Sequence, residues 1–159
     1  LMIINELLKE NKNSNLFNEI HVYSGTNFKN LKNWIKQKCN FLTLYNDKVH
    51  IKSRDSINDI FKEKGVVLSH QNDTTQNYLY FEAIYNKIPL IHNSPILYED
   101  NIAYYYNEND IETGCKQLLH GLVNGDDTDY THYLNKFSIY NKTNLTGINN
   151  IIVDNIKLD

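Results

Sequence analysis

The chain has 159 residues, of which 41% are apolar and 22% are charged, so its length and composition suit one globular domain rather than a disordered segment. Its 16 basic and 19 acidic side chains give a net charge of −3, which argues against a nucleic-acid-binding protein that relies on phosphate contacts. The sequence has no apolar run long enough to span a bilayer and no signal segment, so we expect a cytoplasmic protein, in a host cell if the gene is viral.

The first half of the chain opens with a helical pattern and continues with short strand-like runs. Apolar residues recur at helical spacing from Leu1 to Leu8. Because no start signal precedes them, we expect residues 1–18 to be the end of an upstream domain or an interdomain helix. Strand-like runs follow at residues 19–23, 41–45 and 48–52. Helical patterns cover residues 28–38 and 57–64.

The second half repeats the alternation of strand and helix. Strand-like runs occupy residues 66–68, 89–91 and 103–106. Helical patterns cover residues 77–87, 111–123 (after the N-cap Asp110) and 129–140. Strands that alternate with helices of about ten residues predict a Rossmann-like, doubly wound α/β domain over residues 19–125, with a mostly parallel sheet and helices on both faces. Residues 126–159 form a C-terminal helix and tail.

A polar loop after the strand at 66–68 is the first candidate for a binding site. Open parallel sheets bind ligands beyond the carboxyl ends of their strands. Residues 69–77 form a long polar connection there, and they lead into a helix N-terminus that favours an anion such as a phosphate. The alternative is that Asp73, Thr74 and Thr75 only cap the helix.

Glu82 is the second candidate, because it lies in a helix that is apolar or aromatic on nearly every side. Such a helix is usually buried, and a buried carboxylate needs partners. The two hydroxyls of a ribose would provide them. The alternative is a half-exposed Glu82 at the edge of the helix beside Asn86.

These residues form a pattern that resembles a known family. Glu82-Ala83, four residues, and then Ile88-Pro89-Leu90-Ile91 follow a strand that ends in Val66-Val67-Leu68-Ser69. This order resembles the donor-binding domain of group-1-like GT-B glycosyltransferases. The resemblance covers residues 19–123 in element order, and the motif itself covers residues 66–92.

The resemblance implies a C-terminal, Rossmann-like half of a GT-B enzyme that binds a nucleotide-activated sugar and transfers the sugar to an acceptor. Residues 126–159 would then pack toward the enzyme's own N-terminal domain, without which the fragment would be inactive. The resemblance also implies that residues 66–69 form an inner strand of the sheet. It further implies that no metal or other cofactor is bound.

The family's donor site maps onto this chain at the loop and at Glu82. The resemblance assigns the ribose hydroxyls to Glu82 and the neighbourhood of the diphosphate and sugar to Gln76 and Asn77. Other candidates around the same rim are Ser69, His70, Thr75, Tyr78 and Asn93. Thr74 stands where many retaining members have a first glutamate, and Lys87-Ile88 replaces the usual glycine. Retaining or inverting chemistry therefore stays open, as does a degenerate fold that serves as a binding or assembly module.

His70 and His92 follow two successive strands and are candidate catalytic residues. A histidine there would stabilise a diphosphate leaving group or donate to a sugar hydroxyl. A zinc pair and histidines that bond within loops are the alternatives.

Weaker candidates lie earlier in the chain. Ser24 and Gly25 are expected to form a turn whose backbone N–H groups would meet a phosphate. The alternative is an ordinary strand-to-helix turn. Arg54 follows the strand at 48–52, near the side where the base of a nucleotide is expected. The alternative is that it is an ordinary surface arginine.

Two further patterns carry little weight for a metal site. Asp127-Thr128-Asp129 matches the metal motif of GT-A glycosyltransferases but reads here as an N-cap. Cys39 and Cys115 lie far apart without a Cys-x-x-Cys pair, so neither a disulfide framework nor a zinc cluster is expected. The 25 asparagines and the single arginine indicate an A+T-rich genome.

Overall fold

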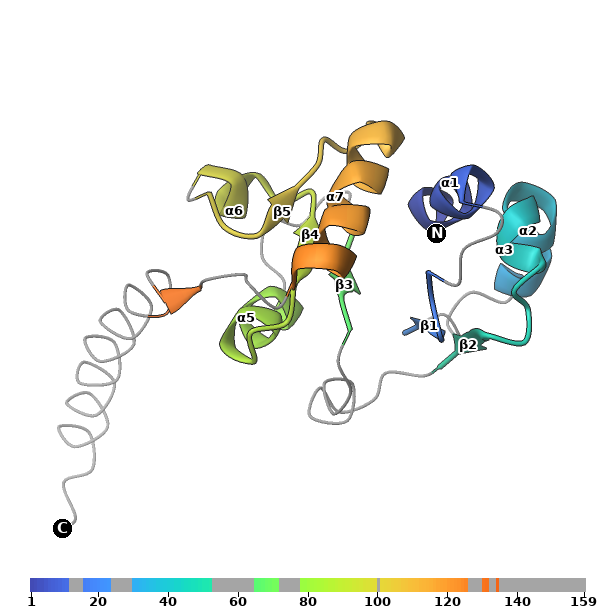
Figure 1. Ribbon diagram of the computed structural model, residues 1–159, viewed down its shortest axis with the longest axis horizontal. Helices are drawn as coiled ribbons and strands as arrows, with labels where there is room; N and C mark the ends of the chain where they lie inside the picture. The colour runs from blue at the N-terminus through green and yellow to red at the C-terminus, as the bar shows by residue number, and fades with distance from the viewer. Residues whose placement is uncertain are drawn as a thin grey trace, which may run out of the picture.

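The computed structural model describes residues 1–11, 16–23, 30–52, 65–71, 78–99, 101–125, 130–131 and 134. Within these ranges the chain is mixed α/β, with helices that alternate with short strands (Figure 1). The predicted turn at 24–27, the helix at 57–64, the loop residues 72–77 and most of the helix at 129–140 lie outside the described residues.

The first half contains three helices and two strands in the described ranges. They are α1 (Met2–Glu10), β1 (Ile20–Val22), α2 (Leu31–Lys38), α3 (Asn40–Thr43) and β2 (Val49–Ile51). The predictions of a first helix, of strands at 19–23 and 48–52 and of a helix that ends at residue 38 are confirmed. The predicted strand at 41–45 is wrong.

Residues 40–43 form a helix because a buried side chain from α1 caps it. The Oδ1 atom of Asn5 accepts the backbone N–H groups of Phe41 (3.0 Å) and Leu42 (3.2 Å), which are among the N–H groups that a helix N-terminus leaves unpaired. Leu42 is fully buried in the adjoining core. A short apolar run fits either a strand or a helix, and this contact across the fold selects the helix.

The second half contains three strands and three helices in the same ranges. They are β3 (Val67–Leu68), α5 (Tyr78–Tyr85), β4 (Leu90–His92), α6 (Pro95–Glu99), β5 (Tyr104–Tyr105) and α7 (Ile111–Asn124). The N-cap at Asp110 is confirmed, because its side chain accepts the backbone N–H of Thr113 at 2.9 Å. Helix α6 was not predicted, although Ser94 before Pro95 is a usual helix start.

All strand pairs in the described ranges are parallel, as predicted. β1 pairs with β2, and β3, β4 and β5 form a second sheet in that order. β3 has β4 on one side only among the described residues, so it is the edge strand of its sheet there. The predicted parallel pairing is therefore confirmed, whereas two small sheets do not establish one doubly wound sheet with residues 66–69 inside it.

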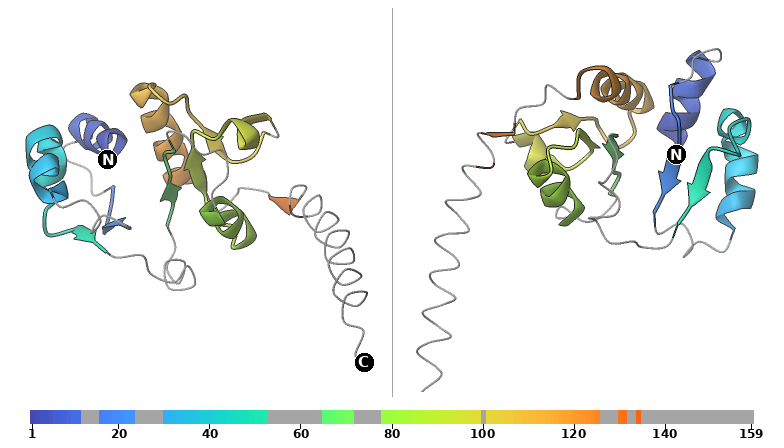
Figure 2. Two further views of the ribbon diagram at one scale, coloured as in Figure 1. Left: turned by 180° about the vertical axis from the view of Figure 1, so that it is seen from behind. Right: turned by 60° about the horizontal axis from the view of Figure 1, so that its bottom comes forward.

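Helices cover both faces of the sheet β3-β4-β5. Successive residues of a strand point to opposite faces, and the fully buried Leu90 and Ile91 belong to different core clusters. Leu90 packs with residues of α5 and α6, including Ile84 and Leu97. Ile91 packs with residues of α7, including Leu118. Helix α7 therefore lies on the face opposite α5 and α6 (Figure 2).

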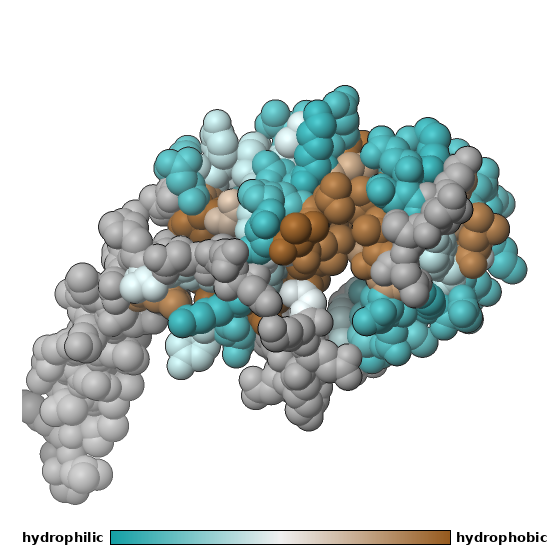
Figure 3. All heavy atoms as spheres, in the orientation of Figure 1, coloured by the Kyte–Doolittle hydropathy of each residue, from teal (hydrophilic) through white to brown (hydrophobic). Residues whose placement is uncertain are grey.

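Helices α1 and α7 lie side by side and join the two halves of the molecule (Figure 1). Ile3 and Leu7 of α1 share one core cluster with Cys115 and Leu118 of α7 and with Ile20 of β1. Apolar side chains gather in the middle of the face in Figure 3, where the elements around α7 meet those around α1.

No helix in the described ranges has the length and the apolar character that crossing a membrane requires.

Candidate functional site

The carboxyl ends of β3 and β4 are tied together by one side chain. The backbone N–H of Gln71 donates to Oδ1 of Asn93 (2.9 Å), and Nδ2 of Asn93 donates to the carbonyl oxygen of Gln71 (2.7 Å). Asn93 is buried, and so is Ser69, whose N–H donates to the carbonyl of Ile91. Two predicted site residues, Ser69 and Asn93, therefore lie at neighbouring strand ends.

His70 lies at the same strand end and is exposed. Its Nδ1 atom is 3.0 Å from the hydroxyl of Tyr106, and the two rings stack with centroids 6.0 Å apart. Burial raises the pKa of Tyr106, so this hydroxyl keeps its proton. The contact with Tyr106 thus holds one edge of the His70 ring, while the rest of the side chain is open to solvent.

His92, the last residue of β4, is buried and bonds to the backbone of residues that follow the strand. Its Nε2 donates to the carbonyl of Ile102 (2.7 Å), and its Nδ1 accepts the N–H of Ser94 (3.1 Å). Burial lowers the pKa of His92, which favours the neutral ring that these two bonds require. Both ring nitrogens are occupied by the backbone. His92 therefore has no ring nitrogen left for catalysis or for a zinc pair with His70. The contacts fit the alternative, a histidine that bonds to the backbone.

Glu82 is half-buried in the middle of α5, and one of its carboxylate oxygens is shielded from water. The Oε2 atom is buried and has no hydrogen-bond partner among the described residues. Its neighbours Tyr80, Ala83 and Ile84 are fully buried against β4 and α6. A buried carboxylate oxygen without a donor costs free energy, so a hydrogen-bond donor that reached Oε2 would be favourable.

Of the other predicted site residues, one lies in the part of the chain that the structure describes and several lie outside it. Tyr78 begins α5 and is 81% exposed, so it lies at the surface next to the loop. The remaining candidates lie outside the described residues: Ser24, Gly25, Arg54, Thr75, Gln76 and Asn77. The Asp127-Thr128-Asp129 motif lies outside them as well.

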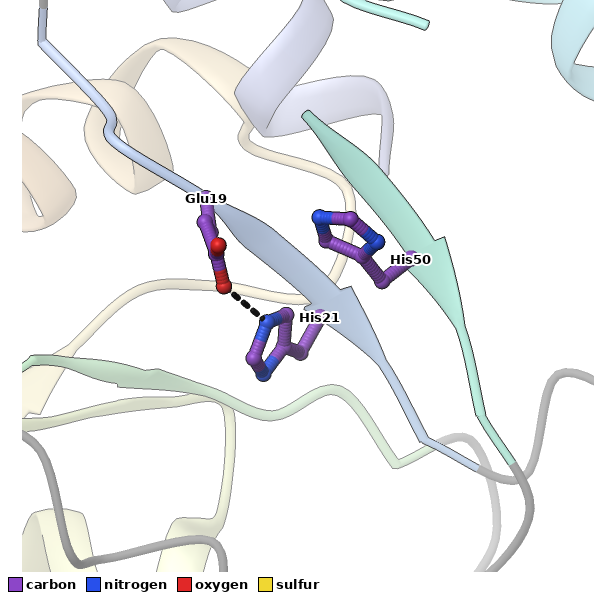
Figure 4. Close-up of side chains that lie close together, drawn as sticks. All are labelled: Glu19, His21 and His50. Carbon is purple, nitrogen blue, oxygen red and sulfur yellow. Dashed lines mark hydrogen bonds and ion pairs between the residues drawn. The ribbon is translucent and has the colours of Figure 1, made fainter. Parts of the chain in front are cut away.

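A separate polar cluster, formed by Glu19, His21 and His50, was missed from the sequence. The three side chains lie close together on one face of the β1–β2 sheet (Figure 4). The sequence contained the signal. Glu19 and His21 lie at alternate positions of the predicted strand at 19–23, and His50 lies in the middle of the predicted strand at 48–52. Finding it required the register that pairs His21 with His50, which the sequence does not give.

A family model described as "Protein of unknown function (DUF2827)" matches residues 1–152. No curated protein matches the chain, and no solved structure does so either.

Proposed function

The chain belongs to the family of proteins of unknown function DUF2827, and from its own residues we propose that it binds a nucleotide-activated sugar. The proposed context is the donor-binding half of a GT-B glycosyltransferase, which would move the sugar to an acceptor. The unpartnered Oε2 atom of Glu82 carries this proposal.

The proposed fold is one sheet with the strand order β2-β1-β3-β4-β5. All the pairs in the described ranges are parallel, and this order needs only that β1 lie beside β3. Ile20 of β1 and Leu68 of β3 pack against the same core cluster, which supports the order. In a doubly wound sheet of this order, successive strands are added in opposite directions across the sheet on either side of the boundary between β1 and β3. Ligands bind beyond the carboxyl ends of the strands at that point.

Glu82 has the position and the chemistry to accept ribose hydroxyls. It lies about 6 Å along the helix axis from Tyr78, close to the separation between a diphosphate at a helix N-terminus and the ribose attached to it. Two vicinal hydroxyls would donate to the carboxylate, after a rotation of the Glu82 side chain that brings the buried Oε2 atom to the surface.

The rim formed by Ser69, His70, Gln71 and Asn93 supports a site at this edge. The amide of Asn93 fixes the loop after β3, and His70 is the exposed histidine beside it. In the proposal His70 donates to the diphosphate or to a sugar hydroxyl, while Thr75, Gln76 and Asn77 line the helix start.

A binding or assembly module without catalysis is the second candidate function. It is favoured by Thr74, because many retaining members of the GT-B glycosyltransferase family, which the chain resembles, carry a glutamate at this position. In the first candidate the acceptor site would belong to an N-terminal domain, whereas the second candidate transfers no sugar.

The first prediction concerns donor binding, measured by calorimetric titration with UDP-, GDP- and dTDP-sugars. We expect one of them to bind, and we expect Glu82→Gln to weaken that binding by about one to two powers of ten, because a charged hydrogen-bond acceptor is lost. The control is Glu108→Gln, which changes an exposed glutamate in the turn before α7.

Two results would contradict the proposal. If no sugar nucleotide gives heat at millimolar concentration, the non-catalytic module is the better description. If Glu82→Gln unfolds the domain, as seen by circular dichroism, but leaves the affinity of the folded fraction unchanged, Glu82 is a structural residue.

A further inference from the structure

The β1–β2 sheet has one apolar and one polar face. Ile20, Val22, Val49 and Ile51 pack toward the core that α1 and α7 share. Adjacent residues of a strand point to opposite faces, so His21 and His50 lie on the other face. Inner parallel strands are usually apolar on both faces, and this polar face therefore calls for an explanation of its own.

Glu19, His21 and His50 form a compact group on the polar face, defined here as the histidine cluster (Figure 4). His21 and His50 are directly opposite each other in the parallel register, and their ring centroids are 5.3 Å apart. Glu19 precedes β1 on the same face. One ligand atom from each of the three residues lies within 4.8 Å of the other two.

The ring of His21 is oriented by contacts at both nitrogens. Its Nε2 atom is 2.7 Å from Oε2 of Glu19, and its Nδ1 atom is 3.4 Å from the hydroxyl of Tyr23. A metal-binding histidine commonly has a hydrogen-bond partner at its second nitrogen, which fixes the ring and the tautomer. Tyr23 is placed to be that partner, and Nε2 is then the nitrogen directed at the carboxylate.

We propose that the histidine cluster binds a zinc ion through Glu19, His21 and His50. Two imidazoles and one carboxylate are a ligand set that Zn²⁺ prefers, with water as the fourth ligand, whereas Ca²⁺ and Mg²⁺ prefer oxygen ligands alone. Bonds of about 2.0–2.2 Å put the ligands of a tetrahedral zinc about 3.4 Å apart. Small side-chain rotations close the present spacing to that value, because the two strands already hold the rings side by side.

The charges around the cluster are compatible with a bound cation. Glu19 contributes the acidic side chain of the cluster, and a carboxylate attracts a cation. Lys52 follows β2, and its ammonium lies 6.0 Å from the centre of the Tyr23 ring. This positive charge would weaken the binding of a cation, and the carboxylate of Glu19 would offset it.

The zinc site is independent of the proposed donor site. Its residues come from β1, β2 and the residue before β1, whereas Glu82 and the rim come from β3, β4 and α5. The resemblance to metal-independent glycosyltransferases gives no reason to expect it. Its proposed effect is to cross-link β1 and β2 on the face where the described residues form no apolar core.

The alternative is that Glu19 only accepts a hydrogen bond from His21 and that His50 is a ring neighbour without a role. The two readings differ at His50, which has no part in that hydrogen bond. A titration of the whole chain with Zn²⁺ alone, and with Co²⁺ alone for its visible absorption, separates them. We expect one equivalent of each ion to bind, with Co²⁺ bands typical of four or five ligands.

We expect His50→Gln to weaken the binding of Zn²⁺ at least tenfold, and Glu19→Gln to do the same. His120→Gln is the matched control, because His120 is exposed on α7 and should leave the binding unchanged. Glu19 is also exposed, so its variant tests the site without disturbing the core. Thermal melting without metal should be the same for all variants.

Several results would overturn the zinc site. They are unchanged binding of Zn²⁺ by His50→Gln or Glu19→Gln, the absence of Co²⁺ bands, and tighter binding of Ca²⁺ or Mg²⁺ than of Zn²⁺. An equal loss of binding in His120→Gln would show that surface histidines in general hold the metal, and it would also contradict the proposal.

Discussion

Some buried polar side chains in the part of the chain that the structure describes have hydrogen-bond partners there and others do not. This difference separates residues that stabilise the fold from a candidate for ligand binding. Both nitrogens of His92 and both amide atoms of Asn93 bond to the backbone. Such residues stabilise loops and have little left to offer a ligand. Glu82 differs, because Oε2 is buried without a partner in the described ranges. The contrast explains why Glu82 rather than His92 carries the proposed function.

The two cysteines are a second case in which burial sets chemistry. Cys39 and Cys115 are free and buried, and both thiols contact α1: the Sγ atom of Cys39 lies 3.9 Å from Sδ of Met2, and that of Cys115 donates to the carbonyl of Ile3. Burial raises the pKa of both thiols, that of Cys115 to about 11. The thiolate, which is the reactive form, is therefore scarce in the folded chain.

We predict that both thiols react slowly in the native protein. At pH 8 a disulfide reagent such as Ellman's reagent should label the folded chain roughly a hundredfold more slowly than the chain in guanidinium, because only the unfolded state offers exposed thiolates. Stopped-flow absorbance measures both rates. Rapid labelling of one thiol in the folded protein would mean that the contact of α1 with α7 or with α3 opens readily.

At the scale of the elements, Asn5 links two helices that are far apart in sequence. Its side chain belongs to α1, and it caps α3 by accepting two backbone N–H groups in a buried environment. We predict that Asn5→Leu lowers the free energy of unfolding by about 2–4 kcal/mol, since two N–H groups lose their acceptor and remain buried. Urea denaturation measures the change.

The control for this change is Asn33→Leu, on the exposed face of α2. It should alter stability by less than about 0.5 kcal/mol. Equal effects of the two substitutions would show that the loss at Asn5 comes from the new apolar side chain rather than from the missing cap.

The sequence predicts elements well where local signals decide them. Strand-like runs placed β1, β2, β3 and β4 within a residue or two, and Asp110 correctly marked the start of α7. It fails where a distant contact decides. The expected strand at 41–45 is replaced by the helix α3 at residues 40–43 because of Asn5, a residue 36 positions away from Phe41. The histidine cluster depends on strand register, and the orphaned oxygen of Glu82 depends on packing, and neither is encoded in a local pattern.

At the scale of the whole molecule, the contact between α1 and α7 determines whether the two sheets belong to one core. Residues from β1, α1, β4 and α7 share the largest apolar cluster, although no strand pair in the described ranges joins the two sheets. The proposed single sheet would require β1 to lie beside β3, and the shared cluster is the packing that would hold them there. A test of this contact therefore tests the arrangement on which the proposed donor site depends.

At Gly114 of α7, a side chain of α1 lies against the helix backbone. A Cβ atom at this position would lie 2.6 Å from Cδ1 and 2.9 Å from Cγ1 of Ile3, which is itself buried. We predict that Gly114→Ala destabilises the protein by about 1–2 kcal/mol, because overpacking outweighs the gain of roughly 1 kcal/mol in helix propensity. Gly65→Ala is the control: no atom lies within 4 Å of its Cβ position, and it should be neutral or slightly stabilising.

A double-mutant cycle assigns the effect to this contact. Ile3→Val alone should cost about 0.5–1.5 kcal/mol, because it removes a buried methyl group. In the Gly114→Ala background the same change also removes the clashing Cδ1 atom, so the double variant should be more stable than the sum of the two single effects predicts, by at least about 0.5 kcal/mol. Chemical denaturation of the four proteins gives the coupling. Strict additivity, or a stabilising Gly114→Ala, would mean that α1 does not pack on α7 at this distance and that the two halves are joined in another way.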